Sequence, residues 1–135
     1  MWIKTYYYFH QKTQRLLMKN KLVIILYSEE KEKLNYALGI LATAAALGRD
    51  TELFLAGKSL FSFLKNKKKS NLNYSNSNEL LLAILELKIK FSICSGALVE
   101  NKIKESNLRE DIIFEITGLT AILAPKKQND QIIFI

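Results

Sequence analysis

The feature of this sequence that most constrains its fold is an uninterrupted apolar run at residues 22–27. The run reads Leu-Val-Ile-Ile-Leu-Tyr, is rich in β-branched side chains and has no polar residue at alternate positions. A strand with one face in water alternates polar and apolar residues, whereas a central strand of a parallel sheet is buried on both faces. The run therefore predicts a central parallel strand.

Helical and strand-like segments alternate along the rest of the chain. The expected helices cover residues 28–47, 59–65, 79–86, 97–104 and 117–124, and the other expected strands cover residues 51–56, 87–93, 112–115 and 131–135. Ser28 is expected to cap the first helix, and Gly48 to end it. Such alternation with short connections is typical of a parallel sheet whose strands are joined by right-handed crossovers. We expect an α/β fold: a three-layer sandwich with a mostly parallel five-stranded sheet.

The 135 residues suit one domain with one hydrophobic core. We place this single domain at residues 21–135 and assign residues 66–78, which are rich in Asn, Lys and Ser, to a basic loop. Residues 1–20 are a poorly defined extension. Either they form a strand-like arm that packs on a neighbour, or Met18 is the true start; the second is favoured because the fold pattern begins abruptly at Lys21.

The net charge of +7 is concentrated in two segments. Residues 1–20 carry four basic side chains and no acid, and residues 65–78 also carry four and no acid, so the remainder has a net charge of −1. Neither segment interleaves aromatic and basic residues across a sheet face, as proteins that bind single strands do. We expect no nucleic-acid partner; contact through the lysines of residues 65–69 is the weaker alternative.

Several other classes of protein are excluded by composition. No run approaches the roughly 20 apolar residues that a membrane span needs, and residues 1–17 lack the pattern of a signal peptide. One cysteine allows neither an intramolecular disulfide nor a cysteine-rich zinc site, and the one histidine, His10, lies in the extension. We expect a cytoplasmic protein with no cofactor, no metal and no membrane contact.

Three carboxylates follow the first expected strand, at Glu29, Glu30 and Glu32. A nucleotide site in a flavodoxin-like fold needs a loop rich in Gly, Ser or Thr at this place, and carboxylates repel phosphate. We expect a solvated helix start here and no acid/base pair.

The cysteine, Cys94, lies where the third expected strand ends. Apolar and polar side chains alternate from Leu87 to Ile93, and a glycine-containing turn follows. Ligands collect at the carboxyl edge of such sheets, and the amino end of a helix favours the nucleophilic thiolate. We expect the amides of Ser95, Gly96 and Ala97 to face the sulfur. The alternative is that Cys94 only packs as a small buried hydrophobe, as free cysteines often do.

The order of these elements resembles the DsrE/DsrF-like family. The first strand is followed by a helix carrying Leu-Ala-Thr-Ala-Ala-Ala-Leu-Gly-Arg-Asp at residues 41–50, and then by the strand at 51–56. The second half has a strand ending in a cysteine, a short helix, Ile-Thr-Gly-Leu at residues 116–119 and a final strand. The resemblance covers roughly residues 21–135.

This resemblance implies a sheet sandwich that assembles into homo-oligomers, or into hetero-oligomers with related subunits. Some members pass sulfur along a relay as a cysteine persulfide, and only Cys94 can take that role here. The implied function is a sulfur carrier in an intracellular transfer step, a sulfurtransferase component that acts with donor and acceptor proteins. The alternative is a non-catalytic interaction module or small-ligand-binding module of the same fold.

Overall fold

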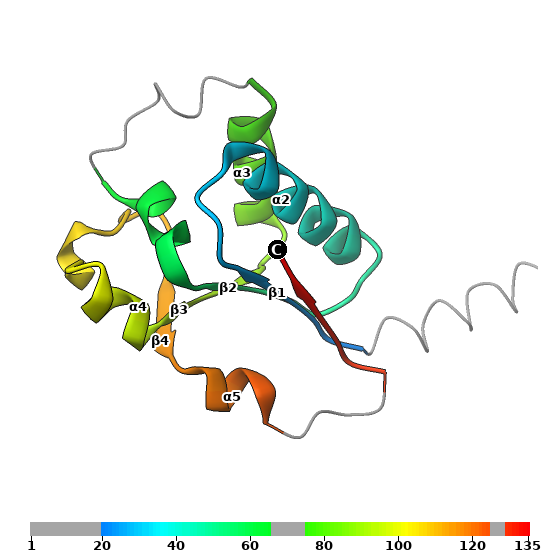
Figure 1. Ribbon diagram of the computed structural model, residues 1–135. Helices are drawn as coiled ribbons and strands as arrows, with labels where there is room; N and C mark the ends of the chain where they lie inside the picture. The colour runs from blue at the N-terminus through cyan, green and yellow to red at the C-terminus, as the bar shows by residue number, and fades with distance from the viewer. Residues whose placement is uncertain (1–19, 66–74, 125–128) are drawn as a thin grey trace, which may run out of the picture.

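The computed structural model describes residues 20–65, 75–124 and 129–135, with residues 75–79 described at the level of the backbone. Its centre is one sheet in which every neighbouring pair of strands is parallel (Figure 1). The strands are β1 (Leu22–Leu26), β2 (Thr51–Leu55), β3 (Lys90–Cys94), β4 (Phe114–Thr117) and β5 (Gln131–Phe134). Their spatial order is β4-β3-β2-β1-β5. The expected α/β fold is confirmed, with a fully parallel sheet.

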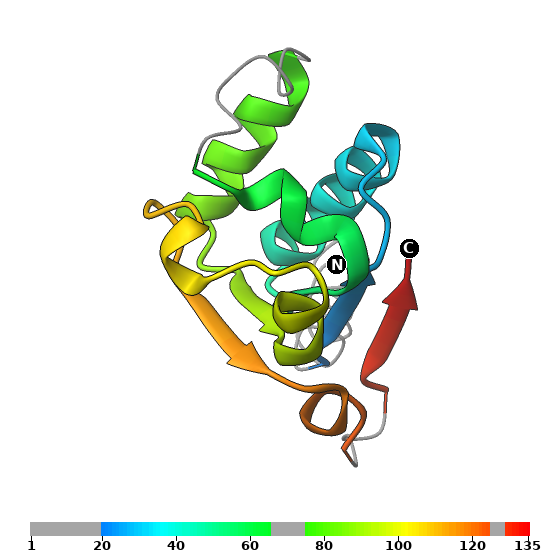
Figure 2. The same cartoon turned by 60° about the vertical axis from the view of Figure 1, so that its left-hand side comes forward.

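The strand order explains where the helices lie. The helical elements are α2 (Lys31–Ala46), η1 (Gly57–Phe63), α3 (Ser75–Glu86), α4 (Ser95–Glu100), η2 (Glu105–Asn107) and α5 (Leu119–Leu123). From β1 to β4 each crossover steps in the same direction, so right-handed connections place their helices on one face. The step from β4 back to β5 is reversed, which places α5 on the other face. Figures 1 and 2 show α2 and α3 on one side of the sheet and α5 on the other.

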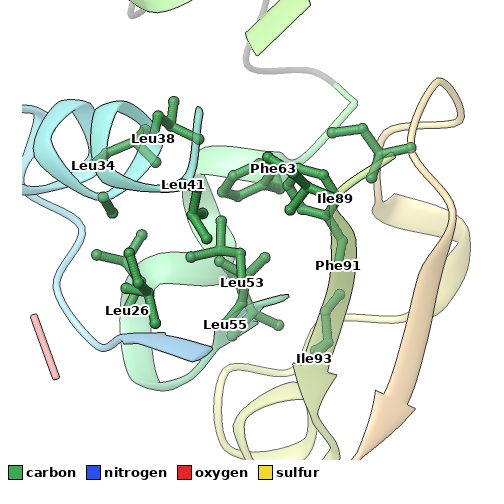
Figure 3. Packing of buried hydrophobic residues seen from close by; sticks show 14 of the residues in the cluster. Leu26, Leu34, Leu38, Leu41, Leu53, Leu55, Phe63, Ile89, Phe91 and Ile93 are labelled. Carbon is green, nitrogen blue, oxygen red and sulfur yellow. The ribbon is translucent and has the colours of Figure 1, made fainter. Parts of the chain in front are cut away.

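The larger core lies between the sheet and α2 (Figure 3). Leu34, Leu38 and Leu41 of α2 point toward apolar residues of β1 and β2, and apolar residues of β3 continue the same core. Beside them, Phe63 packs edge-to-face on Phe91, with ring centroids 6.2 Å apart. A smaller cluster on the α5 face is made of Val23, Ile25, Phe54 and Ile122. All five residues of β1 are buried, as expected for a central parallel strand.

Several predicted boundaries are wrong for local reasons. Glu30, not Ser28, caps α2; the Ser28 hydroxyl oxygen accepts a hydrogen bond from the Glu30 amide at 3.1 Å. The third strand begins at Lys90 and not at Leu87, because Lys88 has a φ of 56° and forms a turn. The first strand ends at Leu26, although the Tyr27 amide still donates a hydrogen bond to the carbonyl of the residue after β5.

Other predicted elements shift by a few residues or change type. The helix expected at 59–65 is a 3-10 helix over Gly57–Phe63, and the helix expected at 97–104 is α4, which ends at Glu100. The strand expected at 112–115 is β4, which begins at Phe114. The last four residues of the loop expected at 66–78 belong to α3. The rest of that loop, and the extension up to residue 19, lie outside the described residues.

Glu52 is a buried carboxylate at the amino edge of the sheet, and its exposed fraction is 2%. Its carboxylate lies 3.2 Å from Lys21 Nζ and 3.5 Å from Lys90 Nζ. Lys90 also lies 2.9 Å from Glu115, and this hydrogen bond raises the pKa of Lys90 above its ordinary value, with Glu52 adding to the effect and burial opposing it. A buried charge must be paired, and Glu52 and Lys90 are partners in the register of β2 and β3. No helix within the described ranges is long and apolar enough to cross a bilayer.

The core makes a direct prediction for two leucines on neighbouring helices. Leu41 is fully buried on α2, whereas Leu82 on α3 is 60% exposed. We expect Leu41→Ala to lower the free energy of unfolding by about 2–5 kcal/mol, because it leaves a cavity. Leu82→Ala should lower it by less than about 1 kcal/mol. Urea denaturation checks both, and equal losses would contradict the packing described.

Candidate functional site

Cys94 is the last residue of β3 and the N-cap of α4. The backbone is extended at this residue, with φ −66° and ψ 120°, and the helix begins at the next position. β3 is an inner strand with β2 on one side and β4 on the other. The thiol therefore lies at the carboxyl edge of the sheet, at a junction from strand to helix, as the sequence predicts.

The Cys94 side chain is partly buried. It packs against the larger core and also against the smaller cluster on the α5 face. The two residues that follow, Ser95 and Gly96, are exposed, whereas Ala97 is buried. One side of the thiol therefore contacts the protein interior, and the start of α4 beside it faces solvent.

Gly96 lies beside the sulfur. A Cβ placed on Gly96 would lie 3.7 Å from Cys94 Sγ. A larger side chain at this position would cover the thiol, so the glycine keeps one approach to the sulfur free of side-chain atoms. The Cys94 side chain makes no capping hydrogen bond with the first turn of α4. The expectation that the amides of Ser95, Gly96 and Ala97 hold a bound sulfur anion stays a prediction.

Helix α4, which follows Cys94 directly, is tied to the turn after β2 by its C-cap residue, Asn101. The Asn101 Nδ2 donates hydrogen bonds to the Gly57 carbonyl at 2.8 Å and to the Ala97 carbonyl at 2.7 Å. Gly57 has a φ of 52°, and its Cα faces the ring of Tyr27. Asn101 thus joins α4 to the turn after β2, and Tyr27, which follows β1, lies beside that turn. Sequence analysis did not identify Asn101, although asparagine is common where helices end.

Thr117 is the strand neighbour of Cys94 and was also missed by sequence analysis. The two residues are paired in the register of β3 and β4, so their side chains leave the same face of the sheet. Thr117 is partly exposed and immediately precedes Gly118, the N-cap of α5. A hydroxyl group is therefore placed next to the cysteine at the carboxyl edge.

Within residues 20–65, 75–124 and 129–135, no three His, Cys, Asp or Glu side chains lie together as a metal site would require. The carboxylates at Glu29, Glu30 and Glu32 are exposed, and Glu30 lies 3.7 Å from Lys33. This agrees with the expected solvated helix start. His10 lies outside the part of the chain that the structure describes.

A fully parallel sheet whose inner strand ends in a partly buried cysteine defines an α/β protein with a candidate cysteine nucleophile at its carboxyl edge. The sequence model of the DsrE/DsrF-like family matches residues 19–135, and the chain belongs to this family. No curated protein matches the chain in sequence. Family membership confirms the resemblance seen in the order of strands, helices and the cysteine.

Solved structures share the fold at low sequence identity. A protein of unknown function from Methanobacterium thermoautotrophicum, MTH1491, has a TM-score of 0.67 at 10% identity, covering 87% of this chain and 100% of its own. The ychN protein from E. coli has a TM-score of 0.61 at 16% identity, with the same coverages of 87% and 100%. BT1422 from Bacteroides thetaiotaomicron, a conserved protein of unknown function, has a TM-score of 0.59 at 18% identity, covering 86% and 95%.

The turn at Gly57 gives a prediction about the support of α4, the helix that follows Cys94. An alanine there would keep a positive φ, and its Cβ would come within 2.6 Å of the Tyr27 ring. We expect Gly57→Ala to lower the free energy of unfolding by about 1–3 kcal/mol, measured by urea denaturation. Gly118→Ala is the matched control, since its Cβ would meet no atom within 4 Å. If Gly57→Ala left the free energy of unfolding unchanged, an alanine at this turn would cause no strain.

Proposed function

We propose that this protein is a sulfur carrier in which Cys94 holds a persulfide between a donor protein and an acceptor protein. The observation that carries the proposal is the partly buried Cys94 at the carboxyl edge, beside the exposed residues Ser95 and Gly96. Protein contacts on one side can hold the sulfur in place, while the other side is open to a partner's thiol. Membership of the DsrE/DsrF-like family supports this function, because sulfur relay occurs among its members.

The proposed chemistry needs only one cysteine on this chain. The Cys94 thiolate attacks the outer sulfur of a donor persulfide, and a new S–S bond forms as the S–S bond of the donor breaks. The donor leaves as a thiolate, so there is no net oxidation. In the second step an acceptor thiolate attacks the outer sulfur on Cys94, and Cys94 leaves as a thiolate. A thiolate is the better nucleophile and leaving group in both steps.

The residues around Cys94 would have supporting roles. The backbone amides of Ser95, Gly96 and Ala97 are the donors we assign to the outer sulfur anion, which extends beyond Sγ by one S–S bond. Asn101 would hold α4 in place through its hydrogen bonds to Gly57 and Ala97. We further propose a cytoplasmic setting, where thiols stay reduced, and an assembly with further copies or with related subunits.

Intact-mass measurement tests the carrier directly. After incubation with a protein persulfide donor and removal of excess reagent, we expect the wild-type chain to gain the mass of one sulfur atom, and Cys94→Ser to gain none. Addition of a small thiol should restore the original mass, because it accepts the outer sulfur. An unmodified wild-type chain, or an equal adduct on Cys94→Ser, would contradict the proposal.

The second candidate function is a non-catalytic interaction or small-ligand module in which Cys94 only packs. Its support is the contact of Cys94 with both hydrophobic clusters. Alkylation rates distinguish the candidates. If Cys94 is an accessible carrier thiol, the folded protein should react with iodoacetamide at a rate comparable with that of the urea-unfolded chain.

Gly96 supplies the matched variant for this measurement. Gly96→Val should slow alkylation of the folded protein, because its methyl groups would crowd the sulfur 3.7 Å from the Cβ position. Ala46→Val, at an exposed position in α2, should leave the rate unchanged. A folded wild-type protein that reacts far more slowly than the unfolded chain would favour the packing role.

A further inference from the structure

Thr117 is the polar side chain that a neighbouring strand places beside Cys94. The two residues are paired in the register of β3 and β4, so their side chains leave the same face of the sheet and their backbones lie about 5 Å apart. On the other side of β3, Leu55 is paired with Ile93, one residue before the cysteine. The next residue of that segment is Ala56, which packs against the smaller cluster. Of the two strands that flank β3, β4 therefore supplies the hydrogen-bonding side chain beside the thiol.

The Thr117 hydroxyl is available to a group that enters the site. Within the part of the chain that the structure describes, this hydroxyl forms no hydrogen bond. It is also open to solvent, because no buried side-chain oxygen among the described residues lacks a partner. The hydroxyl of Thr43 differs, since it donates a hydrogen bond to the Gly39 carbonyl at 2.8 Å. The β4 strand thus holds an unused donor at the carboxyl edge of the sheet.

The loaded form of the cysteine brings an acceptor into this space. In a persulfide the outer sulfur extends about 2 Å beyond Sγ, and as an anion it accepts hydrogen bonds. Two glycines leave room for it. Gly96 has no side chain to cover the sulfur, and a Cβ on Gly118, the residue after Thr117, would meet no atom within 4 Å. The outer sulfur can therefore lie between the start of α4 and the end of β4.

We propose that the Thr117 hydroxyl donates a hydrogen bond to the outer sulfur of the Cys94 persulfide. This inference rests on the proposed carrier function and deepens it. The hydroxyl distinguishes the loaded carrier from the empty one, because in the described structure it makes no hydrogen bond with Sγ itself. A charged acceptor makes such a bond about twice as strong as a bond between neutral groups. Thr117 thus adds a side-chain donor to the backbone amides assigned to the sulfur anion, and it stabilises the loaded state between donor and acceptor.

The loading equilibrium tests this donor. Each protein is incubated with glutathione persulfide and glutathione at fixed ratios, and the loaded fraction is measured by intact mass. We expect Thr117→Val to lower the equilibrium constant for loading about tenfold, as the loss of a hydrogen bond to a charged group does. Thr117→Ser should stay within about twofold of the wild type, because serine keeps the hydroxyl donor.

The empty thiol separates this hydrogen bond from a structural effect. Valine keeps the β-branched shape of threonine on a strand, so Thr117→Val should leave the rate at which iodoacetamide alkylates unloaded Cys94 unchanged. Thr43→Val is the matched control, because it makes the same substitution on α2, where the hydroxyl is bound to the Gly39 carbonyl. It should change neither the loading equilibrium nor the alkylation rate.

Several results would overturn the proposal. They are a Thr117→Val protein that loads like the wild type, a Thr117→Ser protein that loads no better than Thr117→Val, and an alkylation rate that falls in parallel with loading. A loss of loading in Ser95→Ala in place of Thr117→Val would assign the bond to another hydroxyl and would also overturn it. In each of these cases a wild type that gains one sulfur leaves the carrier function standing, whereas a wild type that gains none contradicts both.

Discussion

The structure depends on the burial of β1 on both faces. A strand without a polar face is stable only if layers of side chains cover it on both sides, and the parallel sheet satisfies this with crossovers in two directions. The three crossovers from β1 to β4 run in one direction and place α2, α3 and the larger core on one face. The reversed step to β5 places α5 over Val23 and Ile25 on the other. Because β3 is an inner strand of this sheet and Cys94 is its last residue, the cysteine lies at the carboxyl edge of the sheet.

The site combines a local junction with contacts from distant segments. Cys94 reaches the carboxyl edge because its own strand ends there, which is a property of about ten residues of sequence around it. Its support comes from elsewhere: Asn101 joins α4 to Gly57, and Tyr27 packs against that glycine. A proposed sulfur carrier needs this combination, because its thiol must be accessible to partners and held in a defined position between encounters.

Much of the fold could be predicted from the sequence, because burial on two faces and helix amphipathicity leave periodic patterns. The five strands, the helix after the first strand and the place of Cys94 follow from such patterns. The strand order could not be predicted, since it depends on contacts such as Gln131 beside Leu22. The turn at Lys88 was missed because alternation continues through it, although its φ of 56° ends the strand. Asn101 and Thr117 carry no periodic signal; they are related to the site by the hydrogen bond of Asn101 to Gly57 and by the pairing of Thr117 with Cys94 in the strand register.

The pairing of β1 with β5 has a consequence for how the chain is made. Lys21 and Asp130, whose hydrogen bond precedes this pair, are 109 positions apart. During synthesis β1 therefore leaves the ribosome long before its second neighbour exists, and one edge of the most apolar strand has no partner in that interval. An unpaired, apolar edge is prone to join other chains. Translation speed and chaperone protection over this interval thus bear on the yield of folded protein, independently of how stable the finished sheet is.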